Sequence, residues 1–178
     1  MSLLSILTFP NPVLRTKAEN VTEFTPELTP LITDMVETMY DAPGVGLAAP
    51  QIGESIRLIV LDISENEDEK NSMVMVNPEI TNQEGKQVDE EGCLSVLDLT
   101  ASVKRSQRVT VSYQDAEGTP QELTAEGRFA IVLQHEIDHL DGVLFIDHLS
   151  TLKRTLYKKK IKKQLAAAKK KLLSNGKK

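Results

Sequence analysis

The sequence predicts an α+β fold: mostly antiparallel sheets around a central helix that carries a His-Glu-x-x-His pattern, with further helices near both ends. Two observations support this class. Segments typical of β-strands fill the middle of the chain, and helical patterns lie near the two ends and directly after the last strand. A length of 178 residues suits one domain, and 40% hydrophobic residues with no Trp indicate a core of Val, Ile and Leu.

The first helix is expected from about Pro26 to Tyr40. Thr25 can cap it, and Pro26 suits the first helical position. Apolar residues recur along it at helical spacing: Leu28, Leu31, Ile32, Met35, Val36 and Met39. The glycines of the following stretch, "PGVGLAAPQIG", end the helix and open a loop.

Four strands and a second helix are expected after this loop. The strands are residues 56–63, 73–80, 108–114 and 121–127, separated by turn-forming stretches such as "SENEDEK", "NQEGKQ" and "DAEG". The helix should run from about Arg128 to Asp141 and end near Gly142.

The last segment, residues 151–178, is expected to be a long basic helix attached to a catalytic domain of residues 1–150. Ser150 or Thr151 can cap it. One apolar stripe at helical spacing should dock on the body: Leu152, Leu156, Ile161, Leu165, Ala168 and Leu172. The segment holds twelve Lys or Arg and no acidic residue, whereas residues 1–150 have a net charge of −17. Such asymmetry predicts that the tail meets a polyanion; a solvated amphipathic helix is the alternative.

The composition also bears on location. No apolar run approaches the roughly 20 residues that span a bilayer, so no membrane partner is expected. The opening "MSLLSILTFP" lacks the marks of a signal peptide, and the single cysteine, Cys93, excludes an intrachain disulfide. We expect a cytoplasmic protein, although a mature organellar form would have the same features.

The stretch "QHEIDHLDG" contains the residues that point to chemistry. His135 and His139 stand one turn apart on one helix face, so both rings can aim at one point. Glu136 lies about 100° around the helix, where a carboxylate could take a proton from a water held by a metal. His148 is out of phase and is excluded as a helical ligand. The alternative is a helix with two incidental histidines.

A catalytic site of this kind needs a third protein ligand. The longer metzincin pattern would place a histidine at Phe145, and the sequence has no glutamate after Glu136. Cys93, in "EEGCLSV" at the expected start of a strand, can supply the ligand, although a lone cysteine is more often a small buried residue. A Cys/His/His set leaves one position open and suits Zn or Fe(II).

Three stretches, "GVGLAAPQ" (44–51), "EGCLS" (91–95) and "QHEIDH" (134–139), together resemble the peptide deformylase family over nearly the whole chain. The resemblance implies a metal-dependent hydrolase that removes the formyl group from formyl-methionine at the N-terminus of nascent polypeptides. It implies one divalent metal ion, with Fe(II) favoured in the cell and Zn, Ni or Co able to replace it. It further implies that the helix of residues 151–178 contacts ribosomal RNA.

Residue roles follow from the same resemblance. Cys93, His135 and His139 would hold the metal. Glu136 would deprotonate the water, whose oxygen attacks the formyl carbon, and would later protonate the leaving amine. Gln51 and the backbone N–H of Leu94 would stabilise the oxyanion.

Substrate contacts are expected around the same centre. The loop Gly44, Val45 and Gly46 would pair with the substrate main chain, although a plain turn is the alternative. The methionine pocket would be lined by Ile131, Val132 and Val45, with core packing as the alternative for Ile131 and Val132. Gly92 is also expected to bind substrate.

Two departures from the family pattern concern specificity. Leu97 and Thr100 stand where the family has Pro and often Arg, and Arg128 stands where apolar residues are common. We hypothesise that Arg128 supplies the charge that position 100 lacks; a solvated Arg at a helix start is the alternative. Another amidase or peptidase with the same histidine motif, and a non-catalytic ribosome-associated protein with a structural metal, are the alternative functions.

Overall fold

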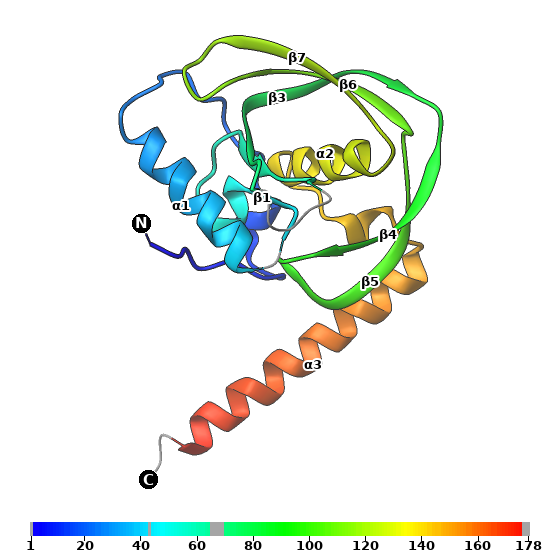
Figure 1. Cartoon of the computed structure of the whole chain (residues 1–178). Coiled ribbons are helices and arrows are strands. Elements are labelled where there is room, and N and C mark those ends of the chain that lie inside the picture. The colour runs from blue at the N-terminus through cyan, green and yellow to red at the C-terminus, as the bar shows by residue number, and fades with distance from the viewer. Residues whose placement is uncertain (1, 43, 65–69, 176–178) are drawn as a thin grey trace.

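A central helix, α2 (Gly127–Leu140), lies between a five-stranded sheet and a two-stranded hairpin (Figure 1). The computed structural model describes residues 2–42, 44–64 and 70–175, with side chains to residue 170. Strands pair antiparallel in both sheets. The predicted α+β class is therefore confirmed. Within the described ranges, no helix has the length and apolar content to cross a bilayer.

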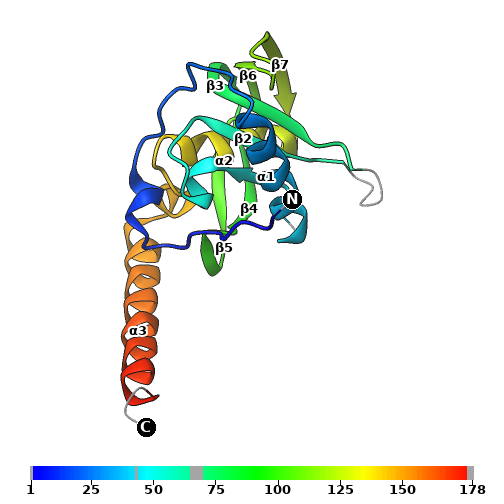
Figure 2. The same ribbon diagram turned by 90° about the vertical axis from the view of Figure 1, so that its left-hand side faces the viewer.

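The larger sheet has the strand order β1-β2-β3-β6-β7 and curves over one side of α2 (Figures 1 and 2). Its strands are β1 (Gly46–Ala48), β2 (Leu58–Leu61), β3 (Met73–Glu84), β6 (Arg108–Gln114) and β7 (Pro120–Glu126). Four of these confirm the predicted strands, although β2 is shorter and β3 longer than expected. The short strand β1 was not predicted, and it forms one edge of the sheet.

The hairpin of β4 (Gln87–Cys93) and β5 (Val96–Arg105) was also not predicted. Cys93 ends β4 at the hairpin turn, so its predicted place at the start of a strand was wrong. The pairing is irregular, because Glu91 faces Ala101 and Cys93 faces Val96. Residues 97–100 therefore bulge out opposite Gly92 alone.

Helix α1 (Leu28–Asp41) confirms the predicted first helix with a later start. The predicted cap was wrong: Glu27 occupies the cap position without a side-chain hydrogen bond, and only the carbonyl of Thr25 accepts from Leu28 N–H, at 3.0 Å. Met35 and Met39 are fully buried and pack the helix against β1 and β2. This contact holds the loop that leads into β1. Single 3-10 turns occur at Pro12–Arg15, Ala49–Ile52 and Phe145–His148.

Helix α2 confirms the predicted second helix. One of its faces packs in the core, and the other carries residues of the candidate site. Leu133, Ile137 and Leu140 pack against the larger sheet together with Met75 and Val111. Its opposite face carries His135 and His139 toward the hairpin. The Gln134 side chain fixes the helix to the β5–β6 connection, because its amide accepts from Ser106 N–H at 2.9 Å and donates to the Ser106 carbonyl at 3.0 Å.

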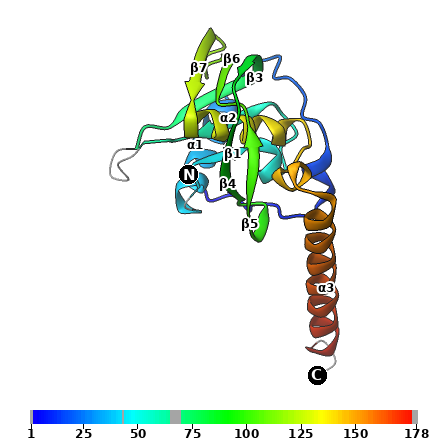
Figure 3. The same cartoon turned by 90° about the vertical axis from the view of Figure 1, so that its right-hand side faces the viewer.

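Helix α3 (Thr151–Asn175) begins at the body and then projects away from it (Figures 2 and 3). Ser150 caps it weakly through Oγ, 3.4 Å from Lys153 N. Tyr157 and Ile161 are buried, whereas Leu152, Leu156 and Leu165 are more than half exposed. The predicted docking stripe is confirmed at Ile161 and wrong at these three leucines and at the exposed Ala168, because the body ends after the first turns of the helix. Leu172 lies outside the residues whose side chains the structure describes.

Candidate metal centre and active site

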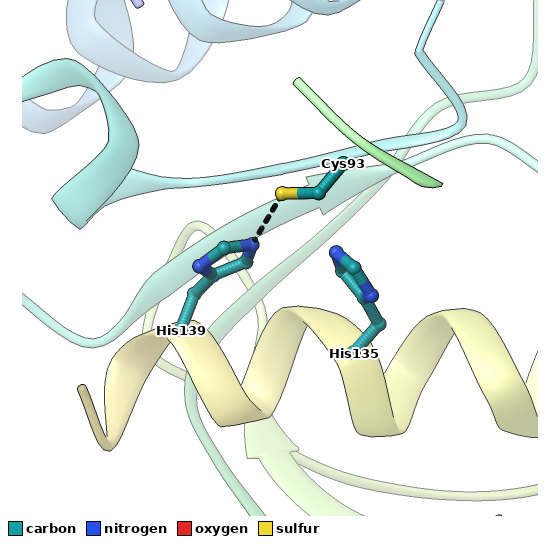
Figure 4. Close-up of side chains that lie close together, drawn as sticks. All are labelled: Cys93, His135 and His139. Atoms are coloured by element: carbon teal, nitrogen blue, oxygen red, sulfur yellow. Dashed lines mark hydrogen bonds between the residues drawn. The ribbon is translucent and has the colours of Figure 1, made fainter. Parts of the chain in front are cut away.

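Cys93, His135 and His139 converge on one point between the hairpin and α2 (Figure 4). One ligand atom from each residue lies within 4.8 Å of the other two. The histidine rings rise from successive turns of α2, and Cys93 Sγ lies 3.2 Å from His139 Nε2. His148 is not part of this group, as predicted from its phase on the chain.

The donor set fits a transition metal. A thiolate and two imidazoles suit Zn or Fe(II), and the site has three protein ligands, which leaves a further position for water or substrate. Burial holds the pKa of His139 well below its usual range, so the ring stays neutral and keeps a lone pair for a metal. His135 uses Nδ1 in a 2.8 Å hydrogen bond to Glu91, which leaves Nε2 for ligation.

Glu136 is buried beside the three ligands. Its Oε2 atom has no hydrogen-bond partner among the described residues. Burial is the largest cause that raises its pKa, to about 7, because the charged carboxylate loses its hydration. A carboxyl with this pKa can both accept and donate a proton near neutral pH.

Gly46 makes room for that carboxylate. A Cβ atom at Gly46 would lie 2.5 Å from Glu136 Oε1, closer than real Cβ atoms approach any heavy atom. Sequence reasoning attributed Gly44 and Gly46 to substrate pairing, with a plain turn as the alternative. The structure adds a steric reason for a glycine at position 46. Strand β1 passes so close to the Glu136 carboxylate that a side chain at this position would collide with it.

Gln51 and Leu94 lie on the opposite side of the centre from α2. Gln51 is buried, and its Oε1 accepts from Ala48 N–H at 2.8 Å. Its Nε2 donates to Ser95 Oγ at 3.1 Å and lies 3.7 Å from Cys93 Sγ. Leu94 occupies the hairpin turn directly after Cys93. Both groups thus lie beside the ligand thiol.

A groove of about 800 Å³ opens onto the centre. It brings together all of the residues predicted to contact substrate: Gly44, Val45, Gly46, Gly92, Ile131 and Val132. Leu97, Thr100 and Arg128 line it as well. Ile131 and Val132 are also buried, so they contribute both to the groove and to packing.

A chain of polar contacts behind the centre, buried at Arg105 and Glu91 and open to solvent at His148, was missed by sequence reasoning. Arg105 Nε lies 2.8 Å from Glu91 Oε1, and Arg105 Nη1 lies 2.5 Å from Asp138 Oδ2. His148 Nε2 lies 2.7 Å from the same Asp138 oxygen. Burial opposes the charge on Glu91, but hydrogen bonds from His135 and Arg105 outweigh it and lower its pKa to about 2.

This series of polar contacts fixes the orientation of the His135 ring. Glu91 therefore remains a carboxylate that accepts from His135, and its own oxygens are held by Arg105. The only sequence signal was an acidic residue two positions before the cysteine, which reads equally well as a surface residue.

Comparison with known proteins agrees with this geometry. A family sequence model described as polypeptide deformylase matches residues 3–155. The chain belongs to the peptide deformylase family. A peptide deformylase of Desulfotalea psychrophila is 60% identical over 164 residues, which span 92% of this chain and 97% of that protein.

Solved peptide deformylases share the fold. The crystal structure of the Legionella pneumophila protein aligns with a TM-score of 0.86 at 48% identity, covering 94% of this chain and 98% of that one. A Met-Ala-Ser-bound structure of the class I type b peptide deformylase from Acinetobacter baumannii aligns with a TM-score of 0.79 at 36% identity, covering 83% and 99%. The protein is thus an enzyme of a metal-dependent family that removes N-formyl groups from nascent polypeptides.

Proposed function

We propose that Cys93, His135 and His139 hold one divalent metal ion and that Glu136 moves the protons of formyl-peptide hydrolysis. The convergence of these four side chains at one end of the groove is the observation that carries the proposal. The bound ion, Fe(II) in the cell with Zn, Ni or Co as substitutes, supplies Lewis acidity that lowers the pKa of a water.

Glu136 first takes a proton from the attacking water, whose oxygen adds to the formyl carbon. The same carboxyl then gives the proton to the amine as the carbon–nitrogen bond breaks, which releases formate and a free N-terminus. Its pKa of about 7, raised by burial, lets one group perform both transfers. Because Gly46 has no side chain, the Glu136 carboxylate can lie directly against β1.

The Gln51 amide and the Leu94 backbone N–H would donate to the oxyanion that develops on the formyl oxygen. Gln51 is preset by its bonds to Ala48 and Ser95, and the second amide hydrogen, which points to Cys93 Sγ at 3.7 Å, is the one that would turn to the oxyanion. Replacing Gln51 by Ala should lower turnover by about 10² to 10³, the usual effect of losing one such donor.

The groove would bind the substrate beside β1. That strand is the edge of the larger sheet, so a peptide backbone can pair along it near Gly44, Val45 and Gly46. Ile131 and Val132, one turn before His135, would line the methionine pocket with Val45, and Gly92 would contact the substrate elsewhere in the groove. The Acinetobacter baumannii structure with bound Met-Ala-Ser supports a peptide of this kind as the ligand.

The experiment that tests this proposal measures formate release from formyl-Met-Ala-Ser, with protein purified without oxygen and its bound metal quantified. Glu136→Gln should abolish measurable turnover while the metal content stays equal to that of the wild type. Metal-loaded wild-type protein that releases no formate would refute the proposal. Acetyl-Met-Ala-Ser distinguishes a broader amidase, since a formyl-sized site excludes the extra methyl group.

We also propose that the enzyme works in the cytoplasm and that residues 151–178 form a basic helix attached to a catalytic unit of residues 1–150. The helix would contact ribosomal RNA. Its lysines at positions 158, 159, 162, 163, 169 and 170 are exposed, and its projection beyond the body lets them approach a polyanion. Binding to phosphates through such charges should weaken steeply with salt.

A charge variant tests the ribosome contact without disturbing the docked part of the helix. Replacing Lys162, Lys163, Lys169 and Lys170 by Gln leaves Tyr157 and Ile161 in place. Ribosome affinity should fall and its salt dependence should flatten, whereas turnover of free formyl-Met-Ala-Ser should stay the same. Unchanged ribosome affinity would contradict the proposal.

A further inference from the structure

One wall of the groove is a bulge of the hairpin. Residues 97–100, here called the groove wall, lie opposite the single residue Gly92, so β4 cannot pair with them in the regular way. Asp98 adopts φ of 55°, a conformation that departs from extended strand. All four residues of the wall line the groove of about 800 Å³. The wall therefore borders the substrate channel without full support from its own sheet.

The side of the groove wall that faces α3 also borders a cavity. A second cavity of about 470 Å³ lies between the wall and α3, lined on one side by Asp98, Leu99 and Thr100. Tyr157 and Lys160 line its other side. Leu97, Asp98 and Thr100 are exposed, and of the four wall residues Leu99 packs against the apolar cluster that contains Tyr157. The hydrogen bonds to the wall therefore add to this one packing contact in fixing its position.

Two side chains of α3 make such bonds. The Tyr157 hydroxyl donates to the Leu97 carbonyl at 3.1 Å. The Lys160 ammonium group donates to the Asp98 carbonyl at 3.2 Å and lies 3.6 Å from the carboxylate of the same residue. Two successive carbonyls of the groove wall are thus tied to one turn of α3.

Of these hydrogen bonds, the one from Tyr157 is held more rigidly. Its side chain is buried, and its ring lies 6.0 Å from that of Phe9. Ile161, one turn further on, is buried beside it in the same apolar cluster. The hydroxyl is therefore fixed by packing, whereas Lys160 is partly exposed and its ion pair is open to solvent.

We propose that Tyr157, assisted by Lys160, is a positioning residue for peptide substrates: it holds the groove wall at the distance that the residues after formyl-methionine require. The inference rests on the proposed function, because it concerns the same groove. The formyl end of the substrate would lie at Cys93, His135 and His139, none of which belongs to the wall, so the wall would meet mainly the residues that follow methionine. Helix α3 then contributes to substrate binding as well as carrying positive charge.

Tyr157→Phe tests this inference, because it removes the hydroxyl and keeps the ring. Kinetics should be measured on metal-loaded, full-length protein with formyl-Met-Ala-Ser and with formyl-methionine amide, which lacks the residues after methionine. For the tripeptide, KM should rise about threefold to tenfold at unchanged kcat, the effect of losing one hydrogen bond. For the short substrate, both constants should match those of the wild type.

Tyr113→Phe is the matched control, since the Tyr113 hydroxyl has no hydrogen bond within the described part of the chain and lies on β6, away from the groove. Lys160→Met should raise the tripeptide KM in the same direction by a smaller factor. A purely structural role of Tyr157 predicts a lower Tm with no dependence on substrate length.

The outcomes separate the two proposals. Wild-type protein that releases no formate overturns the proposed function, and this inference with it. Wild-type turnover with the same tripeptide KM in Tyr157→Phe overturns the inference alone. A fall in kcat, or an equal rise of KM for both substrates, also overturns it, because either result means a general disturbance of the site.

Discussion

The Nδ1 atom of His135 lies 2.8 Å from Oε2 of Glu91, and this bond links a proposed metal ligand to a buried ion pair. Arg105 holds the same carboxylate through two nitrogens, at 2.8 Å and 3.0 Å. Orientation of a ligating imidazole through its second nitrogen is a general feature of metal sites. In this protein the orienting carboxylate lies two residues before the third proposed ligand, Cys93.

Glu91→Gln should weaken metal binding by about 10- to 100-fold, the usual effect of losing such a partner. A neutral amide has a single oxygen acceptor. It cannot accept a hydrogen bond from His135 and also pair with Arg105 through two oxygens, as the carboxylate does. Competition with a chelator, followed by metal analysis, measures the change. Glu90→Gln is the matched control, because that neighbouring carboxylate is exposed and does not contact the ligands. Equal metal retention by Glu91→Gln and Glu90→Gln would contradict this role.

Gly46→Ala should lower kcat by roughly 10- to 100-fold, because the added methyl group displaces the Glu136 carboxylate and small misplacements of reacting groups are costly. Gly44→Ala provides a graded comparison. Its added Cβ would come closest to the end of the Leu94 side chain, at 2.9 Å, which can move, whereas the nearest backbone oxygens lie at the ordinary distances of 3.4 and 3.5 Å. Steady-state kinetics should therefore show a much smaller loss for Gly44→Ala, and equal losses would argue against steric contact with Glu136 as the cause.

Arg128→Leu should raise KM for formyl-peptides, and Arg128→Lys should largely preserve it. The guanidinium lines the groove and has no hydrogen bond or ion pair with any described residue, so it is free to meet a substrate. We expect charge at this position to replace the Arg that the family often has where this chain has Thr100. An unchanged KM in Arg128→Leu would leave Arg128 as a solvated residue at a helix start.

Asp62→Asn should reduce stability at neutral pH and much less at very low pH. Partial burial alone would raise the pKa of Asp62, but hydrogen bonds from Ser64, Tyr40 and Asn71 outweigh it and lower the pKa to about 2. A group whose pKa falls on folding stabilises above its unfolded value of about 3.9, and that contribution is lost as pH falls toward 2.

The expected difference in unfolding free energy is about 1 kcal/mol at pH 7, since solvent reaches this carboxylate. Urea unfolding of both proteins between pH 7 and pH 2 measures it. A difference that stays constant over this range would show that the effect is not due to ionisation.

Ile161→Ala should destabilise the protein by about 2 kcal/mol, and Leu165→Ala by less than about 0.5 kcal/mol. Both residues lie on α3 within one turn of each other, but Ile161 is 8% exposed and Leu165 is 51% exposed. Thermal unfolding of the two variants tests where the helix leaves the body. Similar losses would mean that the docked part of α3 extends beyond Ile161.

Sequence reasoning located the helices and four strands because their apolar periodicity is strong. It missed β4 because Glu91 is the sole buried residue of that strand and is charged. It missed β5 because the bulge at residues 97–100 interrupts the alternation that leads to Val103 and Arg105. Period-2 patterns cannot be read across such a break.

The proposed ligands were found because spacing on one helix, together with a lone cysteine, is visible in the sequence. The contacts between Tyr157 and Leu97, and between Arg105 and Glu91, join residues far apart in the chain, and no local pattern marks them. The docking stripe on α3 failed for a related reason. Amphipathic spacing shows where a helix could bury a face, but not where the partner surface ends.

The separation of charge along the chain has a physical consequence in solution. Residues 151–178 carry twelve positive charges, ten of them within α3, which extends away from a body of net charge −17. The molecule therefore has a large permanent dipole along this helix. A polyanion would turn it end-on before contact, with the helix leading.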